Sequence, residues 1–175
     1  MQTNGATGAV GLQRVLADAR RRGLALDIVS RAPAASLAEA ATLLGIQPAE
    51  IVKTLIIRQR KARVLADGPV SAAYLFALVP GDRQVSWPRL RKLVQVNRLA
   101  FPDPAEALAA TGYERGTITP LGSSTPWPVY ADSRILGRIS IGAGEHGYSA
   151  FVDAEPLLSS FEATVADITE PLSHH

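Results

Sequence analysis

Apolar residues recur along this chain with two different periods, and the two periods predict its helices and strands. A spacing of three or four residues, as at Leu12, Val15, Leu16 and Ala19, predicts an amphipathic helix. Alternating or continuous apolar runs bounded by Gly, Pro or Asp predict strands. On this basis helices are expected at residues 12–22, 36–44, 88–94, 104–110 and 156–161, and strands at residues 24–29, 51–57, 63–66, 74–79, 98–101, 129–131, 139–141 and 149–152.

Hydroxyl and glycine residues mark the ends of several of these helices. Glu39 follows Ser36 by three residues, which is the pattern of a capping box at a helix start. Gly23, Gly45 and Gly112 each follow a predicted helix, where a left-handed glycine can end it. The end signals and the apolar periods therefore place these helices at the same residues.

The order of the elements indicates the fold class. Helices and strands are interspersed, but several strands follow one another directly, which favours an α+β fold over a regular parallel βαβ array. We expect a mixed, strongly curved β-sheet or barrel with flanking helices. Residues 1–10 are expected to be a flexible lead-in, residues 11–170 a single domain, and residues 171–175 a tail.

Composition excludes several classes of protein and of site. The chain has 175 residues, of which 47% are hydrophobic and 19% charged, as expected for a folded domain with a substantial core. It contains no cysteine, which excludes disulfides, thiolate nucleophiles and cysteine-ligated metals. No apolar run approaches the ~18 residues of a membrane span, and residues 1–10 lack the basic start of a signal peptide. A cytoplasmic protein is therefore expected.

The charge balance limits how the chain could bind nucleic acid. Its net charge is only +2, so any such binding has to come from a local basic surface. Basic clusters occur at Arg20, Arg21 and Arg22, at Arg58, Arg60, Lys61 and Arg63, and at Arg89, Arg91 and Lys92. Each cluster is compatible with an ordinary solvated face as well as with a phosphate-binding surface.

Lys53 is the most informative single residue. In the strand predicted at 51–57, Ile51, Lys53, Leu55 and Ile57 share one face, and Val52, Thr54 and Ile56 share the other. Both faces are mostly apolar, so the strand is expected to be buried. A lysine there either extends to solvent or lines a pocket, where it offers a cation to a phosphate or a developing oxyanion.

Two glycine-rich segments are candidate substrate loops. Residues 116–122 combine glycine, which permits unusual backbone angles, with a restricting proline. Such a loop can direct N–H groups at a carbonyl oxygen, or it can be an ordinary connection. Residues 142–147 match G-x-G-x-x-G, but a dinucleotide fingerprint also needs a following helix. A strand is predicted there, so we expect a glycine turn, either structural or facing substrate.

Histidine offers little to a catalytic site in this sequence. His146 is the only histidine away from the C-terminal His174 and His175, so no convergent histidine metal site is expected. No G-x-S-x-G element is present to support a Ser-His-Asp triad. A lone histidine in a glycine turn is more often an exposed loop residue than a general base.

Taken in order, these segments resemble one known family. The segments are residues 51–55 (Ile-Val-Lys-Thr-Leu), 78–83 (Leu-Val-Pro-Gly-Asp-Arg), 111–113 (Thr-Gly-Tyr), 116–122 (Gly-Thr-Ile-Thr-Pro-Leu-Gly), 128–132 (Pro-Val-Tyr-Ala-Asp) and 142–144 (Gly-Ala-Gly). Their order and spacing resemble the YbaK/EbsC-type aminoacyl-tRNA deacylases and the editing insertion domain of bacterial prolyl-tRNA synthetase. The resemblance covers residues 25–168.

This resemblance implies a mixed β-barrel with flanking helices, and hydrolysis of the ester between an amino acid and the terminal ribose of tRNA. The family's pocket lysine falls on Lys53, its G-x-x-x-P loop on residues 116–120, and its later glycine turn on residues 142–144. The implied catalytic residues are Lys53, Gly116 and Gly144, and the implied substrate-binding residues are Thr54, Thr117, Ile118, Thr119, Pro120, Gly142, Ala143 and His146. No cofactor and no metal are implied.

In this picture Lys53 holds the phosphate of the terminal adenosine or the reacting ester. A positioned water, oxyanion donors and the neighbouring ribose hydroxyl then serve hydrolysis. Lys53, residues 116–120 and residues 142–144 are therefore expected to border one cavity. The implied partners are the acceptor end of aminoacyl-tRNA and an aminoacyl-tRNA synthetase, with no membrane.

We accordingly expect a free-standing trans-editing hydrolase for tRNA-Pro, or a related tRNA, that carries a small amino acid. One alternative is a non-catalytic module of the same fold that binds tRNA or a synthetase. Another is a nucleotide-binding oxidoreductase, which rests on the G-x-G-x-x-G match alone. The presence of Lys53 and of both glycine segments favours the enzyme.

Overall fold

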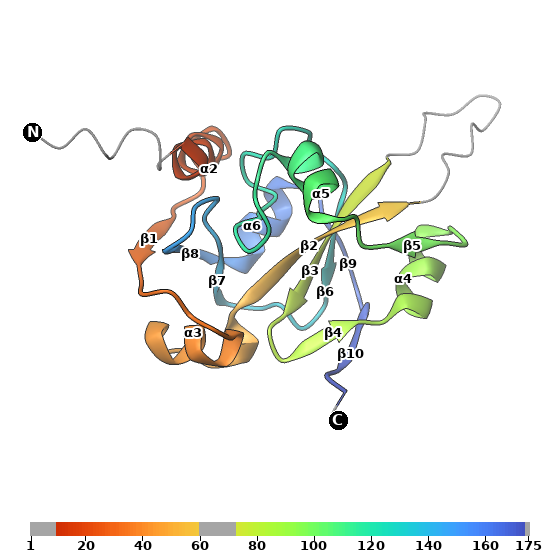
Figure 1. Ribbon diagram of the computed structural model, residues 1–175. Coiled ribbons are helices and arrows are strands. Elements are labelled where there is room, and N and C mark those ends of the chain that lie inside the picture. Colours follow the sequence, from red (N-terminus) through yellow and green to blue (C-terminus); the bar gives the residue numbers. More distant parts are fainter. Residues whose placement is uncertain (1–9, 60–72, 174–175) are drawn as a thin grey trace, which may run out of the picture.

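The computed structural model describes residues 10–59 and 73–173, and its largest sheet has five strands (Figure 1). In spatial order these are β5 (Leu99–Ala100), β2 (Val52–Gln59), β3 (Tyr74–Pro80), β6 (Val129–Asp132) and β9 (Thr164–Ala166). β2 pairs antiparallel with β3 and β5, whereas β3 with β6 and β6 with β9 are parallel pairs. The sheet is therefore mixed, as expected.

Two smaller sheets accompany this one. β1 (Asp27–Ser30), β8 (Tyr148–Asp153) and β7 (Arg138–Gly142) form an antiparallel sheet, and β10 (Thr169–Pro171) pairs with β4 (Arg83–Val85). A single parallel bridge between Ile51 and Ser140 joins the start of β2 to β7. The α+β class is thus found, but closure into a barrel is not found in the described residues, because one bridge does not make a continuous ladder.

Five helices and one 3₁₀ turn are described around the sheets. They are α2 (Val10–Arg21), α3 (Leu37–Leu44), η1 (Pro48–Glu50), α4 (Trp87–Val94), α5 (Pro104–Thr111) and α6 (Ala154–Ser160). The predicted ends of α3 are confirmed: the Ser36 hydroxyl accepts a hydrogen bond from the Glu39 N–H at 3.1 Å, and Gly45 is left-handed with φ of 71°. Gly112 ends α5 in the same way.

The two faces of β2 and β3 pack into two separate cores. Val52 and Ile56 pack on one side with residues of α2, α5 and α6, whereas Ile57 packs on the other side with Leu90 of α4. The period-two prediction for β2 is therefore confirmed. Lys53 and Thr54, which are neighbours in the chain, consequently face different sides of the sheet.

Some elements differ from the prediction. The sequence pattern does not predict β4, β9 and β10, because each has only three residues and because β9 and β10 are largely exposed. The strand predicted at residues 63–66 lies outside the described residues. α2 begins at Val10, the last residue of the predicted lead-in. In residues 10–59 and 73–173 no helix has the length and apolarity that crossing a membrane requires.

Candidate functional site

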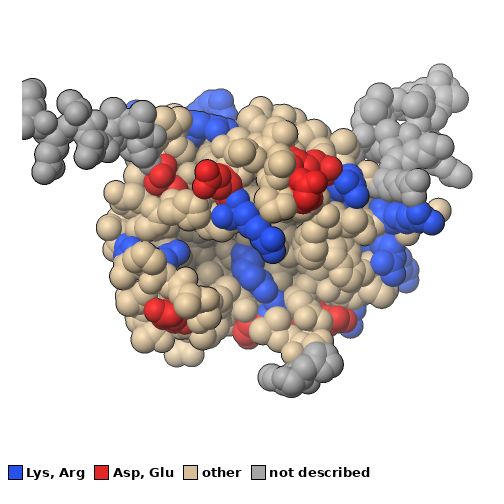
Figure 2. Space-filling model, viewed as in Figure 1, with Lys and Arg blue, Asp and Glu red and all other residues tan. Residues whose placement is uncertain are grey.

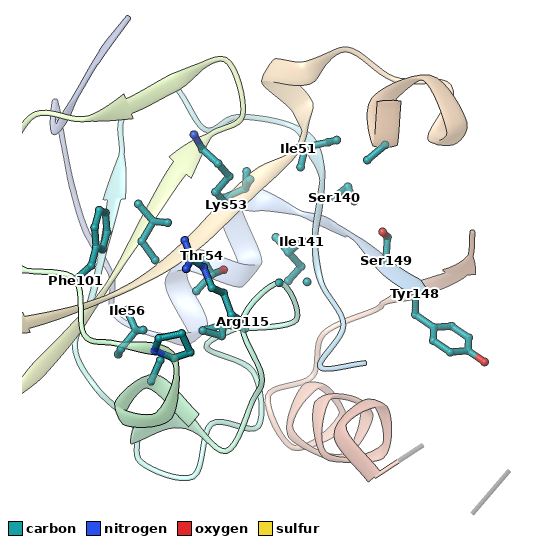
Figure 3. A pocket seen from close by; sticks show the side chains of 18 of the residues that line it. Ile51, Lys53, Thr54, Ile56, Phe101, Arg115, Ser140, Ile141, Tyr148 and Ser149 are labelled. Atoms are coloured by element: carbon teal, nitrogen blue, oxygen red, sulfur yellow. The ribbon is translucent and has the colours of Figure 1, made fainter. Parts of the chain in front are cut away.

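A cavity of about 450 Å³ opens where β2 passes the β7–β8 hairpin. Its floor comes from Ile51, from residues 52–56 of β2 and from residues 140–142 of β7. Further lining comes from Arg31 before α3, from four residues around the start of α5, and from the segment before Pro120. These residues are Phe101, Pro102, Pro104 and Ala107, and Arg115, Gly116 and Ile118. Figure 3 shows these segments, far apart in the sequence, converging around Thr54 and Ile141.

Five of the predicted site residues line this cavity. They are Lys53, Thr54, Gly116, Ile118 and Gly142. Lys53 was expected to border one cavity with the 116–120 loop and the 142–144 turn, and the lining contains Lys53, two residues of the loop and Gly142 of the turn. Chance convergence is improbable because more than sixty residues separate Lys53 from Gly116 in the sequence.

The other predicted residues of the 116–120 loop point into the protein. Thr117 and Thr119 are buried, as is Pro120. The Thr117 hydroxyl donates to the carbonyl of Glu114 at 2.7 Å, and the Thr119 hydroxyl accepts from the Leu121 N–H at 3.3 Å. These three residues lie outside the cavity lining and shape the loop, while Gly116 and Ile118 alternate with them and face the cavity.

The glycine turn is held tightly against this loop. A side chain on Gly142 would place its Cβ only 2.7 Å from the carbonyl oxygen of Ile118, so the close approach requires glycine. The N–H of Gly144 donates to the Thr117 carbonyl at 3.1 Å, and its own carbonyl group lies against Gly11 of α2. Ala143 is buried. Gly144 and Ala143 therefore lie outside the lining, and the catalytic role expected of Gly144 stays a prediction.

Lys53 lies on the cavity wall, but its ammonium is already engaged. The half-buried side chain donates to the backbone carbonyl of Arg83 in β4 at 2.6 Å. In Figure 3 its nitrogen lies on the side of β2 away from Thr54 and Arg115. Burial lowers the pKa of Lys53, and the neighbouring Asp82 carboxylate partly opposes that effect. The ammonium is thus fixed at one side of the cavity and is not directed at the two loops.

The Thr54 hydroxyl, unlike the Lys53 ammonium, has no hydrogen-bond partner among the described residues. Its oxygen is buried within the protein. A buried hydroxyl without a partner costs free energy, so such groups are rare in folded proteins. Thr54 lines the cavity, but its hydroxyl oxygen has almost no accessible surface, so the side chain has to rotate before a bound polar group can supply the missing partner.

Two arginines that the sequence reading did not single out complete the site. Arg31 and Arg115 line the cavity with Lys53, and none of the described lining residues is Asp or Glu. The Arg31 guanidinium donates to the Ser149 hydroxyl at 3.0 Å. Figure 2 shows Lys and Arg side chains across the hollow of this face. The cavity therefore favours an anion. The position of Arg115 directly before Gly116 was the available sequence signal.

His146 lies outside the cavity lining. Its side chain is 65% exposed, and its Nε2 is 3.2 Å from a carboxylate oxygen of Glu114, on the outer side of the Gly116 loop. This placement matches the interpretation of His146 as an exposed turn residue. Within the described part of the chain, no three His, Cys, Asp or Glu side chains gather as metal ligands would.

The comparisons with known proteins decide the family. A sequence profile described as "Aminoacyl-tRNA editing domain" matches residues 31–159. This chain belongs to the aminoacyl-tRNA editing domain family. The editing-domain match contains every residue that lines the cavity, from Arg31 to Ser149. Helix α2, which packs against Gly144, lies before the match.

Relatives of this editing domain include separate proteins and parts of synthetases. A candidate Cys-tRNA(Pro)/Cys-tRNA(Cys) deacylase, EbsC of Enterococcus faecalis, is 29% identical over 128 residues, which is 72% of each chain. The proline–tRNA ligase of Moorella thermoacetica is 31% identical over 77% of this chain, but the chain spans only 22% of that enzyme.

Solved structures show the same fold. A candidate trans-editing enzyme for prolyl tRNA synthetase superposes with a TM-score of 0.79 at 26% identity, covering 92% of this chain and 98% of its own. The hypothetical protein APE2540 superposes with a TM-score of 0.76 at 27% identity, covering 90% and 99% of the two chains. In this fold Gly142 ends β7 and residues 143–147 form the turn of the β7–β8 hairpin, so a strand follows where a dinucleotide fingerprint needs a helix.

Proposed function

We propose that this chain is a trans-editing deacylase that hydrolyses mischarged aminoacyl-tRNA in the cytoplasm. The observation that carries the proposal is the cavity lining, which presents Arg31, Lys53 and Arg115 and no acidic side chain among the described residues. An aminoacylated 3′ end joins a phosphodiester to an amino-acid ester, so it needs cations next to a small polar and apolar recess. The family membership supports the same substrate class.

The reaction needs few catalytic groups. A water oxygen adds to the ester carbonyl carbon, the bond from that carbon to the ribose oxygen breaks, and the ribose oxygen takes a proton. Negative charge develops on the carbonyl oxygen, where N–H donors are effective because they are already oriented. No hydrogen bond within the described residues engages the N–H of Gly116 or Ile118, so both are available as donors on the cavity wall.

The remaining lining groups have separate roles in this proposal. Lys53, Arg31 and Arg115 attract the phosphate of the terminal nucleotide, and Lys53 is kept at its place by the Arg83 carbonyl. The Thr54 hydroxyl, which has no partner among the described residues, bonds a polar group of the esterified amino acid or the ribose.

A small amino acid on tRNA-Pro is the proposed substrate. The part of the floor formed by Val52, Ile56 and Ile141 is apolar and buried, which suits a short side chain. The relatives whose names mention Cys-tRNA(Pro) or prolyl tRNA synthetase support this choice of tRNA. A synthetase is accordingly the proposed protein partner.

The decisive experiment is a panel of mischarged tRNAs incubated with the wild-type protein and with Lys53→Ala. Release of free amino acid by the wild type and its loss in the variant are expected. The alternative, a binding module without activity, predicts that tRNA binds while no amino acid is released above the rate in buffer. That result with every tRNA of the panel would overturn the proposed activity.

A further inference from the structure

A second hollow, of about 330 Å³, lies beside the cavity at the β5 edge of the five-stranded sheet. Its lining consists of Arg58 near the end of β2, Arg91 in the last turn of α4, Asn97, Arg98 and both residues of β5. Three of these lining residues are arginines, and none of those described is acidic. Such a set fits an anion that accepts hydrogen bonds from several guanidinium groups.

Two of these arginines have no ion-pair partner among the residues that the structure describes. Arg58 is paired with Glu106 at 2.9 Å, but among the described residues no carboxylate lies within salt-bridge distance of Arg91 or Arg98. A cation is favourable at a helix C-terminus, which explains a positive charge at Arg91 but not at Arg98. Arg98 follows the left-handed turn at Gln95 (φ 62°) and lies beyond the helix. In Figure 2 basic side chains gather at the right, over β5 and α4.

An exposed aromatic ring lies between the hollow and the cavity. Phe101 is 54% exposed and is supported from behind by Trp87, with ring centroids 5.0 Å apart at 69°. It follows Ala100 directly, so Leu99 and Ala100 border the hollow while Phe101 and Pro102 border the cavity. Figure 3 shows Phe101 at the opposite end of the cavity from Tyr148. A supported, exposed ring is a platform on which an unpaired base can stack.

We propose that Phe101, Arg91 and Arg98 bind the single-stranded nucleotides that precede the esterified one. This rests on the proposed function, which places the esterified nucleotide in the cavity. A preceding base stacks on Phe101, and the backbone phosphates beyond it enter the arginine hollow. Arg58 lies five residues beyond Lys53 on β2, a separation of roughly 17 Å at about 3.3 Å per residue, which a few nucleotides of extended strand can cover.

The chemistry favours a single strand over a duplex or a protein segment. Base pairing would hide the base face that Phe101 can contact, whereas an unpaired 3′ end exposes it. An acidic peptide would satisfy the arginines but not the ring. The combination of a ring next to a cationic hollow is the arrangement by which proteins hold single-stranded nucleic acid.

The test compares binding of a single-stranded RNA tetranucleotide with binding of adenosine 5′-monophosphate. The wild type is expected to bind the tetranucleotide more tightly, and Arg91→Glu or Arg98→Glu to lose that advantage. Each lost phosphate contact should lower the slope of log affinity against log salt by about 0.7. Phe101→Ala should weaken tetranucleotide binding about tenfold, and Phe101→Tyr should retain it.

Arg20→Glu is the matched control, because it makes the same charge change at an exposed position of α2. If Arg91→Glu and Arg98→Glu bind the tetranucleotide as Arg20→Glu does, or if the wild type shows no preference for it, the proposal is overturned. Melting midpoints identify any variant that fails to fold, and Phe101→Tyr then decides the role of the ring.

The two proposals fail separately. Amino-acid release without any tetranucleotide preference contradicts only the nucleotide surface. A tetranucleotide preference that depends on Arg91, Arg98 and Phe101, without release of amino acid from any mischarged tRNA, contradicts only the proposed activity.

Discussion

The Lys53 ammonium and the Arg83 backbone carbonyl form a 2.6 Å hydrogen bond that joins β2 to β4. This bond fixes the charge of the half-buried lysine at one side of the cavity. The cation is therefore positioned before substrate arrives, and a phosphate that binds there meets a charge whose ordering is already complete.

Lys53→Ala is expected to lower kcat/KM for deacylation about 10- to 100-fold, because a contact between a charged group and a phosphate is worth about 1.5–3 kcal/mol. Stability should change little, because the lost hydrogen bond, worth about 1 kcal/mol, is offset by removal of a partly desolvated charge. Lys53→Arg should not restore the rate, since a planar fork does not replace a compact ammonium. Initial rates and a melting curve for each protein check this. Full activity in Lys53→Ala would contradict the role given to the lysine.

The lowered pKa of Lys53 predicts a pH dependence of stability. Between that lowered pKa and the ordinary value of 10.5, the unfolded chain binds more protons than the folded one, so stability rises with pH in this window. Below both values the folded state carries the full penalty of a buried charge. Lys53→Met should remove this rise. Urea unfolding of both proteins between neutral pH and about 10.5 measures it, and identical pH profiles would contradict the prediction.

Thr54→Val tests the buried hydroxyl that has no partner among the described residues. The two side chains have nearly the same shape, so stability is expected to stay equal or to rise by up to about 1 kcal/mol. Deacylation should fall, because the hydroxyl no longer reaches the substrate. Thr54→Ser keeps the hydroxyl and is the control for lost packing. A valine variant that is more stable and fully active would show that the hydroxyl does not contact substrate.

The sequence could predict the strand that carries the site but not the whole site. The period of residues 51–57 placed Lys53 and Thr54 correctly on a buried strand, because alternation depends only on local backbone geometry. Pattern alone could not show that Thr117 and Thr119 face inward while Ile118 faces the cavity, since loop orientation depends on contacts such as Thr117 with Glu114. The sequence pattern could not predict β9 and β10 either, because three-residue strands are specified by the strands they pair with.

Arg31 and Arg115 show a further reason for incomplete prediction. Each is an ordinary surface arginine by local pattern, and each gains importance only because folding brings it to the same cavity as Lys53. The exposed Phe101 is similar: its position beside both the cavity and the arginine hollow depends on the short pairing of β5 with the end of β2. Such convergence of distant residues is a property of the tertiary structure.

Gly142→Ala is expected to reduce activity by displacing the loop that carries Gly116 and Ile118. The added Cβ would lie 2.7 Å from the Ile118 carbonyl oxygen and 3.2 Å from that of Thr117. Both atoms belong to backbone, so the loop must move, and overpacking of this kind costs about 1–3 kcal/mol. The two N–H groups assigned to the developing oxyanion would move with it, and misplaced donors lose much of their effect.

Gly137→Ala separates this effect from a general loss of stability. Gly137 is left-handed with φ of 70°, and a Cβ there meets nothing within 4 Å, so its replacement introduces backbone strain without displacing a neighbour. It lies outside the cavity lining. Both variants should melt earlier than the wild type, but only Gly142→Ala should lower kcat for deacylation when both are assayed well below their melting temperatures. Equal kcat values in the two variants would show that the close contact of Gly142 with Ile118 serves folding alone.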